Sequence, residues 1–172
     1  AILDKVYKMK SQSKPGEKIK IMEKRKIYIG ADSAGYELKE HLKQMLMNEG
    51  YEVSDKGTYS TASCHYPDYA RAVCEEVQKD LEGTFGILIC GTGIGMSMCA
   101  NKFKGIRAAL CADTFSARMT RAHNDANMIC MGARVTGVCL AEDILHAFLD
   151  AEFEGRRHQK RINKITEIEN NQ

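Results

Sequence analysis

The sequence predicts a three-layer α/β/α sandwich around a five-stranded parallel sheet of the Rossmann-like kind. Three observations lead to this fold class. From residue 26 onward, short apolar segments alternate with longer segments whose apolar residues recur at helical spacing. The segment TFGILIC at 84–90 is apolar on both faces, which is typical of a central strand covered by helices on each side. With 172 residues, the chain has the length of one domain that buries a substantial core.

The alternation places five strands along the chain. They are expected at 26–32, 51–55, 84–90, 105–112 and 127–133. Helices are expected between and after them, at 35–49, 68–81, from the glycine-rich segment to about 102, and at 114–122, 137–151 and 156–168. Because parallel neighbours are joined by right-handed crossovers, these helices should cover both faces of the sheet.

The helices have local justifications. The first carries an apolar stripe and ends at a glycine that suits a C-cap. The stripe is Tyr36, Leu38, Leu42, Met45 and Leu46, and the glycine is Gly50. Pro67 suits the first turn of the helix at 68–81. The helix at 137–151 is expected to be the longest. Its expected inward residues are Leu140, Ile144, Leu145, Phe148 and Leu149. The last helix is polar and basic, and we expect it to form a C-terminal arm.

Charge divides the chain into a basic extension and a mildly acidic body. Residues 1–26 carry a net charge of +6, against −4 for the remainder. We expect residues 1–25 to be a disordered extension and residues 26–172 to form a single domain. A body without a basic face does not predict nucleic-acid binding. No apolar run has the length that a bilayer requires, so no membrane segment is predicted.

The cysteines indicate a reducing compartment, for which the cytoplasm is the default. There are seven, an odd number, and none forms a C-x-x-C pair. This usage argues against a disulfide framework and against a structural zinc site. Most lie in apolar segments and are expected to be small buried hydrophobes, among them Cys99, Cys111, Cys130 and Cys139.

The run CGTGIG, residues 90–95, joins the central strand to the next helix. It lacks the G-K-[ST] of a Walker A loop and does not fit the spacing of the dinucleotide fingerprint. Gly91, Gly93 and Gly95 would let backbone N–H groups point at one spot beside a helix N-terminus, which suits a developing oxyanion. A tight strand-to-helix turn would explain the same glycines.

Ligands of open α/β sheets bind at the carboxyl ends of the strands, and several reactive residues are expected there. Cys90 ends the central strand, and a helix N-terminus lowers the pKa of a thiol. A buried strand-end cysteine is the simpler interpretation. Asp32 follows the first strand and Tyr66 precedes the second helix, although an aspartate there is also a common turn residue. We also expect the turn before the last strand to lie at the carboxyl ends of the strands.

Two further clusters are cationic or titratable. His123 and Asn124 are placed in a loop before the last strand, where Asn124 and Asp125 would fix the tautomer of the histidine. Arg157 and Arg161 are four residues apart on the last helix, so their guanidinium groups share a face and would clamp a phosphate. An ordinary surface histidine and a solvated basic face are the alternatives.

Taken together, these motifs resemble one family. The matching segments are GADSAGYELK, DKGTYS, HYPDYA, GILICGTGIGMSMCANKFKGIRAALC, RAHNDANMICMGAR and EGRRHQKRI, in order along residues 26–169. They are similar to ribose-5-phosphate isomerase type B, within the wider family that includes the galactose-6-phosphate isomerase subunits. The combination of CGTGIG, HND and R-H-Q-x-R is specific, whereas no single segment is.

The resemblance implies a metal-free and cofactor-free aldose–ketose isomerase that interconverts ribose 5-phosphate and ribulose 5-phosphate through an enediolate. It implies Cys90 as the base that moves the proton between C2 and C1. Thr92 and the backbone of Gly91, Gly93 and Gly95 would hold the enediolate. His123 would assist ring opening, with Asn124 beside it. The implied contacts to phosphate or hydroxyls are Asp32, Tyr66, Arg134, Arg157 and Arg161. The family forms homodimers whose sites combine both chains, and tetramers stay open.

One departure from the family pattern concerns the strand-one motif. The usual G-x-D-H is Gly30-Ala31-Asp32-Ser33 here, so a substrate-binding histidine is replaced by a serine that carries no charge. Weaker phosphate affinity or a shifted sugar preference is expected. A phosphohexose isomerase acting on allose or galactose 6-phosphate, a non-catalytic phosphosugar-binding module, and a cysteine hydrolase or redox protein remain as alternatives.

Overall fold

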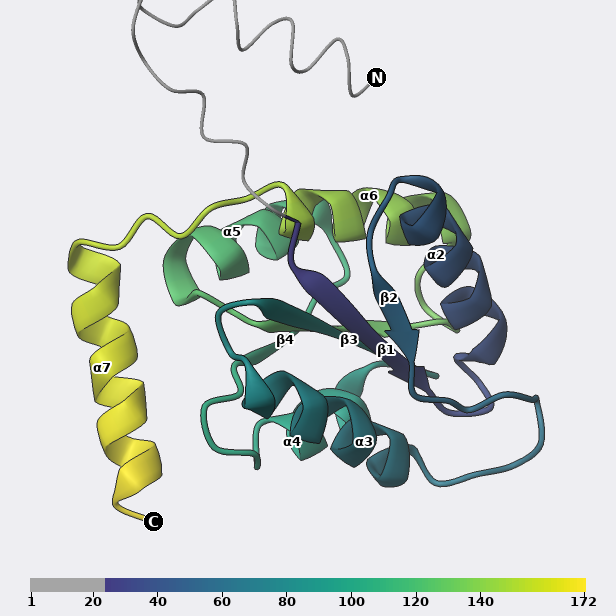
Figure 1. The fold of residues 1–172 in the computed structure, drawn as a ribbon, viewed down its shortest axis with the longest axis horizontal. Helices are drawn as coiled ribbons and strands as arrows, with labels where there is room; N and C mark the ends of the chain where they lie inside the picture. The colour runs from purple at the N-terminus through teal and green to yellow at the C-terminus, as the bar shows by residue number, and fades with distance from the viewer. Residues whose placement is uncertain (1–23) are drawn as a thin grey trace, which may run out of the picture.

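The computed structural model describes residues 24–172, so nearly all of the predicted disordered extension at 1–25 lies outside the described residues. The strands are β1 (Lys26–Ala31), β2 (Val53–Asp55), β3 (Thr84–Cys90), β4 (Ala108–Leu110) and β5 (Met128–Gly132). They form one parallel sheet in the order β2-β1-β3-β5-β4, as Figure 1 shows. The predicted five-stranded parallel sheet is confirmed.

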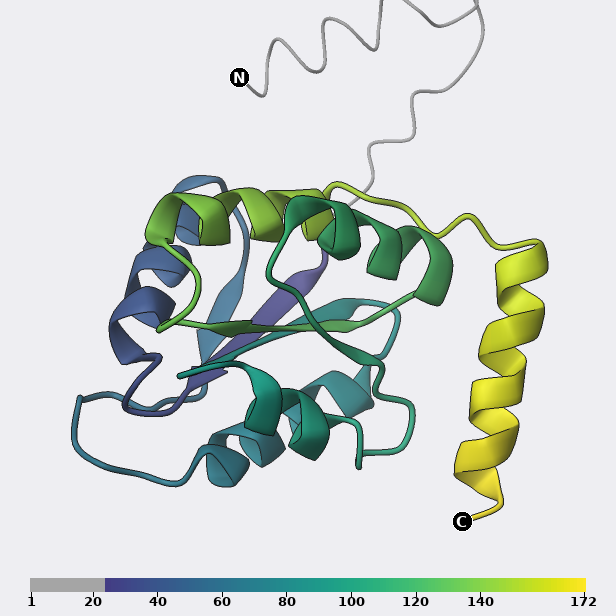
Figure 2. The ribbon, with the colours of Figure 1, turned by 180° about the vertical axis from the view of Figure 1, so that it is seen from behind.

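The helices cover both faces of this sheet. They are α2 (Tyr36–Asn48), α3 (Tyr66–Lys79), α4 (Ile94–Ala100), α5 (Thr114–Asn124), α6 (Val138–Leu149) and α7 (Arg157–Asn170). Figures 1 and 2 show α2, α5 and α6 on one face and α3 with α4 on the other. Each face has its own apolar cluster, and β3 contributes to both because it is buried along its whole length. Helix α7 stands apart as the predicted arm (Figure 1).

Several predicted boundaries were wrong. Only Ala108–Leu110 of the strand predicted at 105–112 pairs with β5, and Gly105 has a positive φ of 77° that extended backbone does not accept. Helix α3 begins two residues earlier than predicted, with Pro67 in its first turn, and it ends at Lys79. With 12 residues, α6 is shorter than the 14-residue α3 and α7.

Two side chains predicted to be buried in or beside α6 are exposed. The buried stripe follows Ala141, Ile144, Leu145 and Phe148, at the i, i+3, i+4, i+7 spacing of one helix face. Leu140 lies on the flank of that stripe in the first turn and is 42% exposed. Cys139 is exposed as well, and Cys99 is only half-buried.

No helix within residues 24–172 combines the length and the apolar character needed to cross a bilayer.

The strand order predicts a ligand-binding crevice at the carboxyl ends of β1 and β3. These strands are neighbours, with Ala31 opposite Ile89. The chain leaves β1 toward α2 on one face of the sheet and leaves β3 toward α4 on the other (Figures 1 and 2). The two connections therefore diverge, and a crevice of this kind is where open α/β sheets bind ligands. The amide of Asp32 donates to the carbonyl of Ile89 at 3.2 Å, which ties the two sides together.

A buried ion-pair network supports the edge of this crevice. The fully buried ammonium of Lys39 lies 2.7 Å from both carboxylate oxygens of Asp55, at the end of β2, and 2.9 Å from Glu40. Lys43 adds a contact at 2.6 Å, and the amide of Gly57 donates to Asp55 at 2.9 Å. Burial disfavours the ionised carboxyl, but these hydrogen bonds outweigh burial and lower the pKa of Asp55.

We predict that Asp55→Asn removes a pH-dependent part of the stability. A carboxyl whose pKa is lowered by folding stabilises the protein above the unfolded pKa of about 4, and this contribution disappears as the pH falls through the lower folded value. Lys39 keeps Glu40, so the expected loss at pH 7 is about 1–2 kcal/mol. Urea unfolding between pH 7 and pH 3 should show a shallower acid dependence than wild type. Glu52→Gln, at an exposed ion pair, is the control. An unchanged acid slope would contradict the prediction.

Candidate active site

Cys90 lies at the crevice, as the last residue of β3. Its side chain is nearly buried, with 5% exposed. The sulfur accepts a hydrogen bond from the amide of Gly93 at 3.1 Å. This amide opens α4, and Gly93 adopts a left-handed conformation with φ of 79° to place it. The turn therefore fixes the position of the sulfur at the end of β3.

The glycines of the run allow close approach of three elements. A Cβ on Gly93 would lie 2.9 Å from the carbonyl carbon of Met131 in β5, and one on Gly95 would lie 2.6 Å from the ring of Tyr66. A Cβ on Gly132 would meet the backbone of Thr92 at 2.5 Å. Packing therefore requires these glycines, which supports the tight-turn interpretation. The exposed Thr92 and the amides beside it also line the crevice, so the two interpretations are compatible.

Four more predicted residues gather at this end of the sheet. The Tyr66 ring lies over Gly95, at the start of α3. The side chain of Arg134 lies over Gly91, because a Cβ placed there would be 3.5 Å from its Nη1. Asp32 and Ser33 follow β1, and both are half-buried. The residues of this first half-site are Asp32, Ser33, Tyr66, Cys90, Gly91, Thr92, Gly93, Gly95 and Arg134.

Asp32 is partly committed to structure. Its Oδ1 accepts hydrogen bonds from the amides of Ala34 at 3.0 Å and Gly35 at 3.1 Å, which forms the turn into α2. The interpretation of Asp32 as a turn residue is therefore confirmed, and its contact with a ligand stays a prediction. The loop lies close to the glycine run, because a Cβ on Gly91 would be 3.8 Å from the Cβ of Ala34.

The remaining predicted residues form a second half-site elsewhere: His123, Asn124, Arg157 and Arg161. His123 and Asn124 end α5 and do not lie in a loop, so that placement was wrong. Arg157 and Arg161 are exposed on α7. The ring of His123 stacks on the ring of His158 with centroids 4.2 Å apart and an angle of 7° between the planes. The predicted role of Asp125 in orienting His123 was also wrong, because its carboxylate binds two arginines.

The two half-sites lie at opposite ends of β5. Cys90 is opposite Gly132, the last residue of that strand, whereas Asn124 precedes Met128, the first. Five residues of parallel strand span about 13 Å, so a small substrate at Cys90 does not reach His123 of the same chain. The turn before β5 was therefore wrongly placed among the carboxyl-end segments. An element before a strand lies at the amino edge of a parallel sheet.

The second half-site is held by an arginine clamp on Asp125. Asp125 caps α5 in the left-handed conformation, with φ of 46°. Its Oδ1 accepts from the nearly buried Arg121 at 2.7 Å and its Oδ2 from Arg107 at 3.1 Å. Arg107 also donates to the carbonyl of Asn124 at 3.1 Å. The turn after His123 is thereby fixed to the body of the domain.

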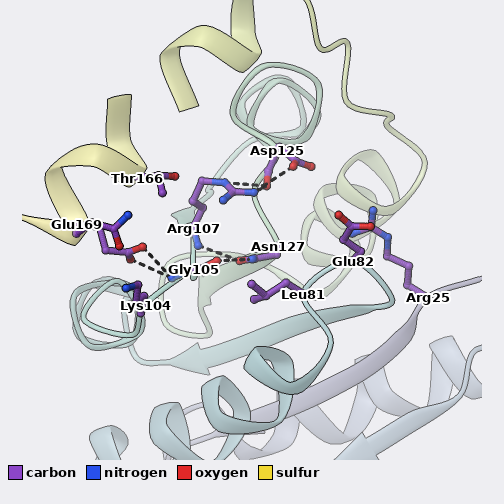
Figure 3. A pocket seen from close by; sticks show the side chains of 11 residues that line it. Arg25, Leu81, Glu82, Lys104, Gly105, Arg107, Asp125, Asn127, Thr166 and Glu169 are labelled. Carbon is purple, nitrogen blue, oxygen red and sulfur yellow. Dashed lines mark hydrogen bonds and ion pairs between the residues drawn. The ribbon is translucent and has the colours of Figure 1, made fainter. Parts of the chain in front are cut away.

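A cavity of about 520 Å³ separates α7 from the body, and it contains none of the predicted site residues. Figure 3 shows Arg107 reaching Asp125 on one side and the carboxylate of Glu169 facing Gly105 on the other. The Gly105 amide donates to both Glu169 oxygens, at 3.0 and 3.1 Å. These contacts anchor the far end of the arm, and we assign the cavity no chemistry.

The comparison with known families decides the class of this site. The model of the Ribose/Galactose Isomerase family matches residues 27–165. This range includes every residue of both half-sites. The chain belongs to the ribose/galactose isomerase family. It is therefore an isomerase of phosphorylated sugars, and the alternatives of a non-catalytic module, a hydrolase and a redox protein fall away.

Individual members of the ribose/galactose isomerase family agree closely with this chain. Ribose-5-phosphate isomerase B of Escherichia coli (strain K12) is 47% identical over 146 residues, covering 84% of this chain and 97% of the relative. D-erythrulose-4-phosphate isomerase of Pectobacterium atrosepticum is 46% identical, covering 81% and 91%. A crystal structure of ribose-5-phosphate isomerase B from Mycoplasma genitalium with bound ribulose-5-phosphate has a TM-score of 0.83 at 40% identity, covering 86% and 97%.

Sequence reasoning missed two residues of the second half-site. His158 stacks on His123, and Glu154 lies 3.8 Å from His123 and 3.4 Å from His158. The spacing of Glu154 and His158, four residues apart within EGRRH, was visible in the sequence. It predicts proximity on one helical face, although α7 itself begins only at Arg157.

Proposed function

We propose that this isomerase interconverts ribose 5-phosphate and ribulose 5-phosphate through an enediolate, with Cys90 as the base. The observation that carries the proposal is the Cys90 sulfur, hydrogen-bonded to the Gly93 amide at 3.1 Å in the crevice between β1 and β3. The ribulose 5-phosphate in the Mycoplasma genitalium relative supports the choice of sugar. The same sugars would place the chain in the metabolism of pentose phosphates. Seven free thiols suit the reducing cytoplasm.

The proposed chemistry follows from the first half-site. The Cys90 thiolate removes the proton from C2 of the open-chain aldose, and the C1 carbonyl oxygen becomes the oxyanion of the enediolate. Amides of the glycine run and the Thr92 hydroxyl donate toward that charge. The thiol then returns the proton to C1, while the proton of the C2 hydroxyl passes to the C1 oxygen, which leaves a C2 ketone, a C1 hydroxyl and a regenerated thiolate. Asp32 would bind substrate hydroxyls, and Arg134 and Tyr66 would bind the substrate beside the glycines.

We further propose that two copies of the chain complete each site. Cys90 and His123 lie at opposite ends of β5, so ring opening by His123 requires the His123 of a second copy. Arg157 and Arg161 would come from the same second copy, because both are exposed on α7, whose first turn packs on His123 through His158. A homodimer with two shared sites satisfies this geometry, and dimers that pair into tetramers would preserve it.

A coupled assay on the purified chain tests the proposed substrate. Ribose 5-phosphate should be converted to ribulose 5-phosphate with a higher kcat/KM than tetrose or hexose phosphates. The alternative substrates are allose and galactose 6-phosphate. The name of the Pectobacterium relative gives a specific reason to include erythrulose 4-phosphate. A higher kcat/KM for any of these would replace ribose 5-phosphate in the proposal.

We predict that Ser33→His tightens phosphosugar binding. Ser33 is half-buried beside Asp32 and offers a hydroxyl, whereas a protonated histidine offers a charge-assisted hydrogen bond. The expected result is a KM lowered about 3–10-fold, with a larger gain at pH 6 than at pH 8 because the imidazole is charged only at the lower pH. Ser33→Gln is the uncharged control. No gain in affinity for any phosphosugar tried would contradict this role for position 33.

A further inference from the structure

His123, Glu154 and His158 form a cluster of metal-ligating side chains. The Nε2 atom of His123 lies 3.8 Å from one Glu154 oxygen, and the Nε2 atom of His158 lies 3.4 Å from the other. The two imidazole rings stack almost in parallel, with centroids 4.2 Å apart. All three ligand atoms lie within 4.8 Å of one another. Because the lone pair of an imidazole lies in the plane of its ring, the two rings would have to unstack for both nitrogens to bind one ion.

The spacing suits zinc in particular. Zinc binds imidazole nitrogen and carboxylate oxygen at about 2.0–2.1 Å in tetrahedral geometry, which places neighbouring ligand atoms about 3.3 Å apart. The histidine–glutamate distances, 3.4 and 3.8 Å, approach this value but involve the two different oxygens of Glu154, so the carboxylate would have to turn to offer one oxygen to the ion. Two nitrogens and one carboxylate leave the fourth position open to water, as in the His₂Glu sites of zinc enzymes.

His158 is nearly buried, and its Nε2 atom accepts a hydrogen bond from Arg157 that a bound metal would displace. Its side chain is 4% exposed, and the Nε–H of Arg157 points at Nε2 from 3.4 Å, so this nitrogen presents its lone pair. Burial, followed by the charges of His123 and Arg157, lowers the pKa of His158, whereas Glu154 opposes the shift. A neutral imidazole is the form that binds metal. Because Arg157 and Arg161 repel a cation from the same helix, we expect a micromolar dissociation constant.

We propose that His123, Glu154 and His158 form a binding site for a divalent transition metal such as Zn²⁺, and that the bound ion inhibits isomerisation by occupying His123. Binding of the metal stands on the cluster alone. The inhibition rests on the proposed function, in which His123 assists ring opening. An ion held by His123 takes away the lone pair or proton that this step uses.

The test is a titration of the full chain with Co²⁺, whose absorption bands report tetrahedral coordination, followed by Zn²⁺ displacement. One equivalent per chain is expected in wild type, and the affinity should fall at least tenfold in His158→Gln and Glu154→Gln. Two matched controls should keep the wild-type affinity: Glu152→Gln, an exposed acid two residues from Glu154, and His41→Gln, which pairs with Glu142 on another face. Equal binding in all variants would overturn the site. Thiolate-to-cobalt charge-transfer bands that vanish in Cys90→Ala would also overturn it.

Inhibition is measured separately, so the two proposals fail independently. In the isomerase assay, Zn²⁺ should inhibit wild type at the concentrations that fill the site, and the half-inhibitory concentration should rise at least tenfold in Glu154→Gln. Zinc binding without inhibition of an active enzyme would overturn the regulatory part of the inference. Zinc binding by a chain without turnover on any phosphosugar would instead count against the proposed function.

Discussion

Replacing Cys90 by alanine is expected to lower kcat by about 10²–10⁴-fold, the range that a positioned general base contributes. The substitution removes the only atom at the end of β3 that accepts the Gly93 amide and can carry the substrate proton. KM should change little, because the proposed phosphate and hydroxyl contacts involve other residues. A coupled ribose 5-phosphate assay at saturating substrate measures the effect. Cys90→Ser is expected to lose nearly as much, since a hydroxyl keeps the shape of the site but barely ionises near neutral pH.

Two controls separate the base from a packing role. Cys99→Ala removes a half-buried thiol from the far end of α4 and should leave kcat within a factor of about two. Thermal unfolding of Cys90→Ala should show a folded protein, because the lost side chain is small. Turnover that survives in both Cys90 variants would mean that another group moves the proton.

Substituting Asp125 by asparagine is expected to destabilise the fold by about 3 kcal/mol and to reduce activity. Arg121 is nearly buried, with 4% of its side chain exposed, and its guanidinium would lose a carboxylate partner at 2.7 Å. Removing one member of a buried ion pair leaves an uncompensated charge, which costs about 3–5 kcal/mol, while the remaining bond from Arg121 to the Ala126 carbonyl keeps the loss near the lower value. Asparagine tolerates the left-handed backbone of this position, so the charge alone is tested.

Urea unfolding measures the stability of Asp125→Asn. KM and kcat of the variant are then compared with those of wild type at urea concentrations below the unfolding midpoint of the variant. Because the clamp holds the turn that presents His123, kcat for the closed-ring substrate should fall more than the affinity for phosphate. Asp113→Asn is the control, since Asp113 caps the opposite end of α5 and asparagine also caps helices well. A loss below about 1 kcal/mol would contradict the role of Asp125 as the counterion of the nearly buried Arg121.

The position of the first half-site could be predicted because segments that follow parallel strands meet at one edge of the sheet. A strand that is apolar on both faces, ends in Cys90 and is followed by a glycine run indicates where the substrate would bind. The alternation of strand and helix patterns along the chain indicates the parallel sheet. Short elements were less predictable: the segment 105–112 has an apolar pattern, but Gly105 and the loop after it leave only three residues for β4. Leu140 was misplaced because the end of a helical stripe depends on what packs beside it.

The second half-site was predicted by residue type and misplaced in space. His123 precedes β5, so it lies at the amino edge of the sheet. The direction of β5 determines this edge, whereas the residue types around His123 do not. The stacking of His123 on His158 joins α5 to α7, two elements that are separated by β5 and α6. Contacts of this kind depend on where the arm folds back, which periodicity does not report.

Complementation between two inactive variants tests most directly whether Cys90 acts in a site shared between chains. Cys90→Ala is mixed in equal amounts with the double variant His123→Ala/Arg161→Ala, and the chains are exchanged by mild denaturation and refolding. Half of the dimers then contain both chains, and each such dimer has one intact site, so about a quarter of wild-type activity should return. If each chain holds a complete site of its own, mixing restores nothing, and that result would contradict the account.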